Sequence, residues 1–117
     1  MYEVLYFENR KGICPVKEFL KTIKLPARAK AMKWIEKLSL EGPDLPRPYA
    51  DVLRGKIREL RVVFGSDSYR FLYFFVGKNI VITHGFLKKT RKIPAREIKR
   101  AESMMADFII RQKKLGG

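Results

Sequence analysis

The segment from Leu53 to Lys92 constrains the fold of this chain more than any other part. It contains three runs rich in Val, Ile, Phe and Tyr, and the short sequences GSDS and GKN separate these runs. Because β-branched and aromatic residues favour strands, and because Gly, Asn, Asp and Ser favour tight turns, the segment predicts three consecutive antiparallel strands. We therefore expect a meander at the centre of the fold.

The alternation of side chains along these strands predicts which residues share a face of the sheet. In the first strand, Ile57–Phe64, one face carries Leu60, Val62 and Phe64, and the other carries Ile57, Glu59, Arg61 and Val63. In the second strand, one face carries Tyr69, Phe71, Tyr73 and Phe75, and the other carries Arg70, Leu72 and Phe74. Two arginines are thus expected within apolar strands, where a guanidinium needs an anion, a carbonyl group or a stacking plane.

The N-terminal half predicts one strand and two helices. Residues 2–7 are β-branched and aromatic, so we expect a strand that joins the meander. Apolar residues at helical spacing from Pro15 to Ile23 predict a first helix, and a similar pattern from Ala27 to Leu40 predicts a second that ends at Gly42-Pro43. The prolines of residues 44–49 predict an extended connector.

After the meander, Ile93-Pro94 opens a final helix that continues to about Lys114, and Gly116 and Gly117 are expected to fray. The predicted fold class is therefore α+β, with two N-terminal helices and one C-terminal helix on one face of a mainly antiparallel four-stranded sheet. The other face is expected to be partly open. The length of 117 residues and the 46% hydrophobic content fit a single domain over residues 1–117.

The net charge of +14 is spread over the whole chain and favours a polyanionic partner. Nucleic acid, or a protein with a strongly acidic surface, is the first expectation. A membrane partner is not expected, because no apolar run approaches the roughly 20 residues of a spanning helix. The single cysteine, Cys14, cannot form an internal disulfide, and this fits a reducing cytoplasmic location.

Cationic residues flank the meander on both sides. They are Arg54, Lys56, Arg58, Arg61 and Arg70 near its start, and Lys88, Lys89, Arg91 and Lys92 at its end. Because hairpins return distant residues to one place, these cations can converge into a phosphate-binding surface. For each mid-strand arginine, an internal ion pair with Glu59, Asp67 or Glu97 is an equally good interpretation. The Lys88-Lys89 pair is also typical of a solvated charge run.

Cleavage of RNA by its own 2′-hydroxyl requires a base, an acid and stabilisation of the charged phosphorane. Arginine and lysine supply the stabilisation well. For proton transfer the candidates are His84, Glu59 or a lysine surrounded by cations, although a lone histidine is more often structural. The sequence has no phosphate-binding GxxxxGK[ST] motif and no Cys/His spacing typical of a metal site, so neither a metal nor another cofactor is expected.

Several motifs of the chain resemble the RelE/ParE toxin superfamily. They are Leu53-Arg54-Gly55, Glu59-Leu60-Arg61-Val62, Tyr69-Arg70-Phe71-Leu72-Tyr73, His84-Gly85-Phe86-Leu87-Lys88-Lys89-Thr90, and Ile93-Pro94 followed by Glu97-Ile98 and Ala101. The resemblance extends over nearly the whole chain and is greatest to the phage-derived HigB-type branch. It implies the toxin of a type II toxin–antitoxin system, which acts as a metal-independent, ribosome-dependent mRNA endonuclease.

The resemblance also implies roles for individual residues. Arg61 and Arg70 match positions for phosphate binding and transition-state charge, Arg54 takes the place of a basic residue, and Lys88 and Lys89 match basic positions at the end of the last strand. From the residues themselves we expect Lys88 to join the two arginines in catalysis and His84 or Glu59 to assist proton transfer. The cations expected to bind the RNA backbone are Arg54, Lys56, Arg58, Lys89 and Arg91. The sequence departs from RelE at Ile57 and Glu59, where RelE has lysines, and near Arg91, where RelE has a tyrosine. An inhibitor of DNA gyrase of the ParE type, or a non-catalytic nucleic-acid-binding protein, is the alternative on the same scaffold.

The implied partners are mRNA in the ribosomal A site and a cognate helix-turn-helix antitoxin of the HigA type. Electrostatic complementarity predicts that this antitoxin presents acidic residues. Phe19, Trp34 and Met104 are the expected apolar anchors for it on the helices.

Overall fold

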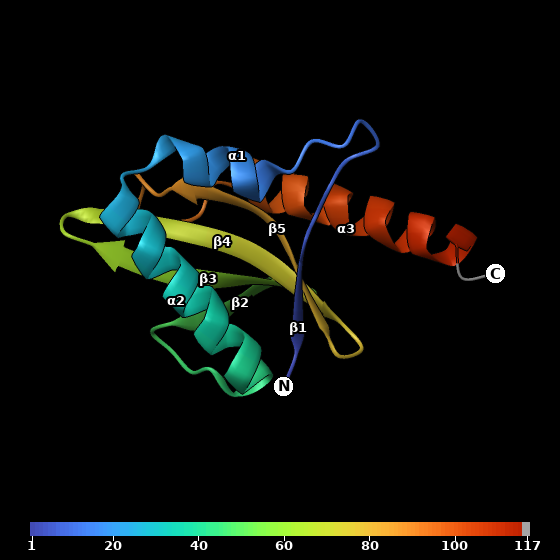
Figure 1. The fold of residues 1–117 in the computed structure, drawn as a ribbon, viewed down its shortest axis with the longest axis horizontal. Helices are drawn as coiled ribbons and strands as arrows, with labels where there is room; N and C mark the ends of the chain where they lie inside the picture. Colours follow the sequence, from blue (N-terminus) through green and yellow to red (C-terminus); the bar gives the residue numbers. More distant parts are fainter. Residues whose placement is uncertain (116–117) are drawn as a thin grey trace.

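A five-stranded mixed sheet in the order β1-β5-β4-β3-β2 forms the centre of the structure (Figure 1). The structure is a computed structural model, and it describes residues 1–115. The predicted fraying of Gly116 and Gly117 therefore lies outside the described residues. The strands are β1 (Glu3–Tyr6), β2 (Ala50–Arg54), β3 (Ile57–Phe64), β4 (Asp67–Val76) and β5 (Asn79–Leu87).

The prediction of four strands is wrong, because Ala50–Arg54 forms an additional edge strand. β2 pairs antiparallel with β3 through a tight turn at Gly55-Lys56, so the meander has four strands rather than three. Gly55 has a φ of 55°, a left-handed conformation that glycine adopts without the strain of a Cβ atom. The predicted N-terminal strand does join the sheet. It pairs parallel with β5, and this makes the sheet mixed.

The three helices lie close to their predicted ranges. They are α1 (Pro15–Thr22), α2 (Leu25–Glu41) and α3 (Ala95–Leu115), with a short 3-10 turn, η1 (Gly42–Asp44), after α2. Proline occupies one of the first two positions of both α1 and α2, where its missing N–H group is no loss. α2 ends at Gly42, whose backbone N–H donates to the carbonyl of Leu38.

The helices cover both faces of the sheet, so the prediction that they share one face is wrong. α1 contacts β5, and α2 contacts β1 and β3, whereas α3 contacts β3, β4 and β5 from the other side. We call these faces the α1/α2 face and the α3 face. In Figure 1, α2 crosses in front of the sheet, and α3 continues past the end of the sheet.

The predicted alternation along the strands is confirmed. Leu60, Val62, Tyr69, Phe71 and Tyr73 belong to the core of the α1/α2 face, and Ile57, Leu72 and Phe74 belong to the core of the α3 face. Helix α1 packs very closely on the sheet at Gly85. A Cβ atom there would lie 2.7 Å from the ring of Phe71 and 2.8 Å from the ring of Phe19. No helix within residues 1–115 has the length and apolar character needed to cross a membrane.

Candidate functional site

Two arginines lie directly opposite each other on the α3 face. Arg61 of β3 is the register partner of Arg70 of β4, and Glu59 lies two residues before Arg61 on the same face. Like charges at directly opposed positions of neighbouring strands repel each other. The strand register therefore creates a need for an anion at this point, and Glu59 is the nearest carboxylate along the strand.

Glu59 binds both arginines at once. Its Oε1 atom accepts a hydrogen bond of 2.8 Å from Nε of Arg70, and its Oε2 atom accepts bonds of 2.9 and 3.2 Å from Nη2 and Nε of Arg61. Only 4% of the Glu59 side chain is exposed. The structure thus contains the internal ion pair that the sequence allowed for both arginines, with Glu59 as the shared partner.

Arg70 is the more deeply buried of the two arginines. Its side chain is 10% exposed, and burial lowers the pKa of its guanidinium while the adjacent Glu59 carboxylate raises it. Nη1 donates to the hydroxyl of Ser68 at 2.7 Å and to the carbonyl of Tyr69 at 3.2 Å. Its Nη2 atom makes no hydrogen bond to any residue among 1–115. One donor edge of Arg70 is therefore available to a ligand.

Arg61 is more accessible, with 29% of its side chain exposed. Apart from its bonds to Glu59, the Arg61 side chain makes only long contacts. Nη2 lies 3.5 Å from Oδ2 of Asp51, and Nη1 lies 3.4 Å from the carbonyl of Pro48. Asp51 comes from β2, so the edge strand that the sequence did not predict supplies the second carboxylate of the site.

These residues form one wall of a pocket of about 460 Å³, which we call the arginine pocket. Its lining residues are Asp51, Leu53, Glu59, Arg61, Arg70, Lys88, Arg91, Lys92, Ile93 and Ile98. The loop after β5 is fixed beside the arginines, because the backbone N–H of Lys88 donates to the carbonyl of Ser68 at 2.7 Å. Five cations face two carboxylates here, and this excess of positive charge suits a phosphate group.

The structure brings only some of the predicted cations into this pocket. Arg61, Arg70, Lys88 and Arg91 line it, and Lys92 does too. Arg54 lies at the end of β2 and binds Glu102 of α3 at 2.7 Å. Lys56 lines a different pocket beneath the distal part of α3. Arg58 points to the α1/α2 face, where its guanidinium lies 5.3 Å from the ring centre of Phe75. Lys89 is exposed beyond the pocket.

His84 lies in the protein interior, away from the arginine pocket. Its side chain is 1% exposed. Leu72 of β4 lies between His84 and Glu59, so two strand spacings, or about 10 Å, separate these two residues. Its Nε2 atom lies 3.0 Å from Oε1 of Glu97, and its Nδ1 atom lies 3.0 Å from the hydroxyl oxygen of Thr83. Both ring nitrogens are thus engaged within the protein.

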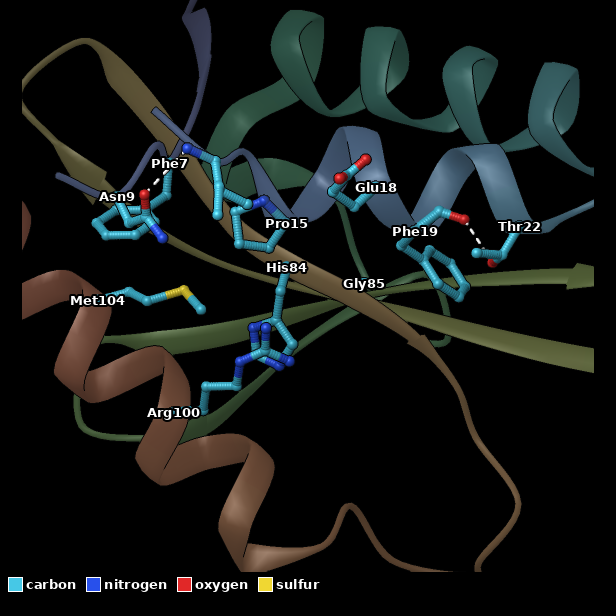
Figure 2. A pocket seen from close by; sticks show the side chains of 11 residues that line it. Phe7, Asn9, Pro15, Glu18, Phe19, Thr22, His84, Gly85, Arg100 and Met104 are labelled. Atoms are coloured by element: carbon cyan, nitrogen blue, oxygen red, sulfur yellow. Dashed lines mark hydrogen bonds between the residues drawn. The ribbon is translucent and has the colours of Figure 1, made fainter. Parts of the chain in front are cut away.

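The surroundings of His84 favour the neutral ring. Burial lowers its pKa most and the charge of Arg100 lowers it further, whereas the hydrogen bond to Glu97 and the charge of Glu97 raise it. Since a carboxylate only accepts hydrogen bonds, the neutral ring donates from Nε2 to Glu97, while the Thr83 hydroxyl beside Nδ1 donates to the carbonyl of Leu72 at 3.1 Å. Figure 2 shows His84 and Arg100 together in a second pocket of about 570 Å³, which α1 and α3 enclose near Phe19 and Met104.

Asp51 is the charged residue of the site that the sequence did not indicate, whereas Lys92 was expected among the convergent cations but without a role of its own. Lys92 carried a signal, since it ends the basic run after the meander. Asp51 carried none, because the segment before it contains Pro46 and Pro48 and did not read as a strand. Among residues 1–115 there is no group of three His, Cys, Asp or Glu side chains that could hold a metal ion.

An α+β fold with three helices on a mixed sheet, and with paired arginines on one face, is compatible with the RelE-like class of small toxins. The match to a protein family supports the same class. Residues 18–106 match the family described as phage-derived protein Gp49-like (DUF891), and the chain belongs to this RelE-like, toxin-related family. A comparison with curated proteins found no match. The family match begins within α1 and extends into α3, and so includes the whole arginine pocket.

Proposed function

We propose that this chain is the toxin of a type II toxin–antitoxin system of the HigB type, and that it is a ribosome-dependent mRNA endonuclease that inhibits translation. The observation that carries the proposal is the pair of opposed arginines, Arg61 and Arg70, held by a buried carboxylate in the wall of a basic pocket. Membership of a phage-derived, toxin-related family supports the same conclusion. The site of action would be the A site of cytoplasmic ribosomes.

The chemistry follows from the pocket. The 2′-hydroxyl of the RNA gives its proton to solvent water and its oxygen attacks the adjacent phosphorus. The bond to the 5′-oxygen breaks, that oxygen takes up a proton, and a 2′,3′-cyclic phosphate and a 5′-hydroxyl end form. Arg61 and Arg70 have donors left after binding Glu59, and these would stabilise the negative charge that develops on the phosphorane. Loss of one such donor typically lowers a rate about 100- to 1000-fold.

Proton transfer would fall to groups that can reach the substrate. Both ring nitrogens of His84 lie against protein groups. Both carboxylate oxygens of Glu59 accept hydrogen bonds from the arginines. Lys88 lines the arginine pocket, so its ammonium group is our candidate for the acid that protonates the 5′-oxygen. Arg91 and Lys92 would hold the RNA backbone at the rim of the pocket.

We also propose a cognate helix-turn-helix antitoxin of the HigA type as the protein partner. The three expected anchors are all half-buried. Phe19 packs edge-on against Tyr69 and Phe71, Trp34 stacks on Tyr49 at 4.7 Å, and Met104 packs on the core of the α3 face. Co-expression with the neighbouring reading frame should restore growth, and a tag on one protein should recover both. Recovery of the toxin alone, without rescue of growth, would contradict this partner.

The endonuclease proposal is tested by mapping the 5′ ends of cellular RNA after brief induction of the chain. We expect new 5′-hydroxyl ends inside translated reading frames, and we expect them to disappear when translation is blocked before induction. Intact messages together with DNA-damage signalling would contradict the proposal and would indicate an inhibitor of DNA gyrase. Intact messages without such signalling would indicate a non-catalytic binding protein.

A further inference from the structure

Two carboxylates contact Arg61 in the arginine pocket, and they do so very differently. Glu59 lies 2.9 Å from Nη2 and 3.2 Å from Nε, and also binds Arg70. Asp51 lies 3.5 Å from Nη2, at the outer limit of a hydrogen bond. The two carboxylates should therefore respond differently when a third anion enters the pocket.

Glu59 cannot leave the arginines without a large loss. It is almost completely buried, and both of its oxygens accept charge-assisted hydrogen bonds. Breaking a buried pair leaves an uncompensated charge in the interior. Glu59 therefore stays in place, and its position at the base of both side chains fixes the direction in which each guanidinium points.

Asp51 can leave Arg61 easily. It lies on the edge strand β2, 21% of its side chain is exposed, and it has other partners to hold it. One oxygen accepts the backbone N–H of Val52 at 2.8 Å, and the other lies 3.0 Å from Nε of Arg47. The bond from Val52 and the charges of Arg47 and Arg61 outweigh partial burial and lower the pKa of Asp51, so it is an anion at neutral pH.

We propose that Asp51 occupies, in the free protein, the place on Arg61 that an RNA phosphate takes in the complex, and that Glu59 is the positioning residue that keeps both guanidiniums directed at that phosphate. The inference rests on the proposed function, because the ligand is taken to be an RNA backbone. Displaced from Arg61, the Asp51 carboxylate remains bound to Arg47 and to the backbone of Val52.

Net charge alone predicts the same effect on RNA binding for the loss of Asp51 and for the loss of Glu59. Asp51 and Glu59 line the same pocket, and removing either charge makes the pocket more positive by the same amount. A general increase in positive charge would strengthen RNA binding in both cases. A displaceable Asp51 and a positioning Glu59 instead predict effects of opposite sign.

The test measures the affinity of the full chain for a short single-stranded 2′-O-methyl RNA, which cannot be cleaved through its 2′-oxygen. Fluorescence anisotropy at several salt concentrations would compare the wild type with Asp51→Asn, Glu59→Gln and the double variant. Asp44→Asn serves as the matched control, because it removes one exposed carboxylate outside the arginine pocket. Thermal melting of each protein would show that it is folded at the temperature of the assay.

We expect Asp51→Asn to bind about 2- to 5-fold more tightly than Asp44→Asn, in line with the strength of an exposed ion pair. Glu59→Gln should bind roughly 10-fold more weakly than the wild type, since the guanidiniums lose their common anchor. In the double variant the gain from Asp51→Asn should be lost, because Arg61 is no longer directed at the pocket.

Equal affinities for Asp51→Asn and Asp44→Asn would overturn the inference, whether or not Glu59→Gln folds. Tighter binding by a folded Glu59→Gln would overturn the positioning role. These outcomes are independent of the proposed endonuclease activity, because the probe is not cleaved and no ribosome is present. Failure of the activity would show in the mapped RNA ends, whereas failure of the inference would show only in these affinities.

Discussion

The α1/α2 face of the sheet carries one continuous apolar core, whereas the α3 face is apolar at one end and charged at the other. On the α1/α2 face, Val62, Phe71 and Tyr73 are all buried in one core. On the α3 face, Leu72 and Phe74 pack under α3, but Arg70 on the same strand belongs to the arginine pocket. Alternate residues of the same strands therefore build a closed core on one side and an accessible site on the other.

This difference predicts where substitutions remove the fold and where they remove only function. A residue in the α1/α2 core should act through the free energy of unfolding. A residue in the arginine pocket should act on RNA with a smaller effect on the fold.

Phe71→Ala should lower the free energy of unfolding by about 3–5 kcal/mol, as other Phe→Ala changes in cores do. Phe71 is fully buried, and its ring packs edge-on against Phe19 of α1 at 5.9 Å. Chemical denaturation measures the loss. Phe64→Ala, on the same face but at the exposed end of β3, is the control and should cost far less. Equal losses would show that the α1/α2 face is not a continuous core.

Glu59→Ala should lower the free energy of unfolding by about 3 kcal/mol, because it leaves a buried arginine without its anion. Arg61→Ala should cost only about 1 kcal/mol, because Arg61 is partly solvated and Glu59 keeps its bond to Arg70. Chemical denaturation of both variants gives the order. If Arg61→Ala were the more harmful change, Glu59 would not be the centre of the charged cluster.

His84 should make the protein less stable as the pH falls below about 6.5. Its pKa is lowered in the folded state, so the unfolded chain binds the proton first, and stability falls from its unfolded pKa down to its folded pKa. His84→Gln keeps a side-chain donor for Glu97 but cannot be protonated in this range. Thermal melting between pH 7.5 and 5 should show a smaller slope for this variant. Equal slopes would mean that His84 is protonated in the fold.

Arg54→Ala should have the smallest effect on stability. Its ion pair with Glu102 connects β2 to α3, but both side chains are substantially exposed to solvent. Such pairs are screened by salt and contribute little. The melting temperature of this variant in 0.15 M salt should match that of the wild type. A clear decrease would show that β2 depends on α3 for its position.

Local patterns in the sequence were sufficient for most of the fold. The prolines that open the helices and the glycines at the turns predicted the elements, and alternation along β3 and β4 predicted the faces of Arg61 and Arg70. The position of α3 was missed, although a signal was present. Leu72 and Phe74 alternate with Phe71 and Tyr73, so both faces of β4 are apolar and both need a cover.

Other features depend on tertiary contacts that no local pattern contains. β2 is a short edge strand whose pairing with β3 decides its conformation. The strand register between β4 and β5 shifts next to Thr83, and this places His84 on the α3 face, against Glu97. From the sequence, Glu59, Asp67 and Glu97 were all open as partners for the arginines, and only the strand register selects Glu59.

We propose that the arginines of the α3 face, and not the total positive charge, carry the toxin activity. Arg61 and Arg58 allow a direct test, because both lie on β3 but face opposite sides of the sheet. Each variant to Ala removes one positive charge. Growth after induction should be measured for both variants at equal protein levels. We predict that Arg61→Ala abolishes growth arrest and that Arg58→Ala retains it. Growth arrest by both variants, or loss of growth arrest in both, would contradict the claim.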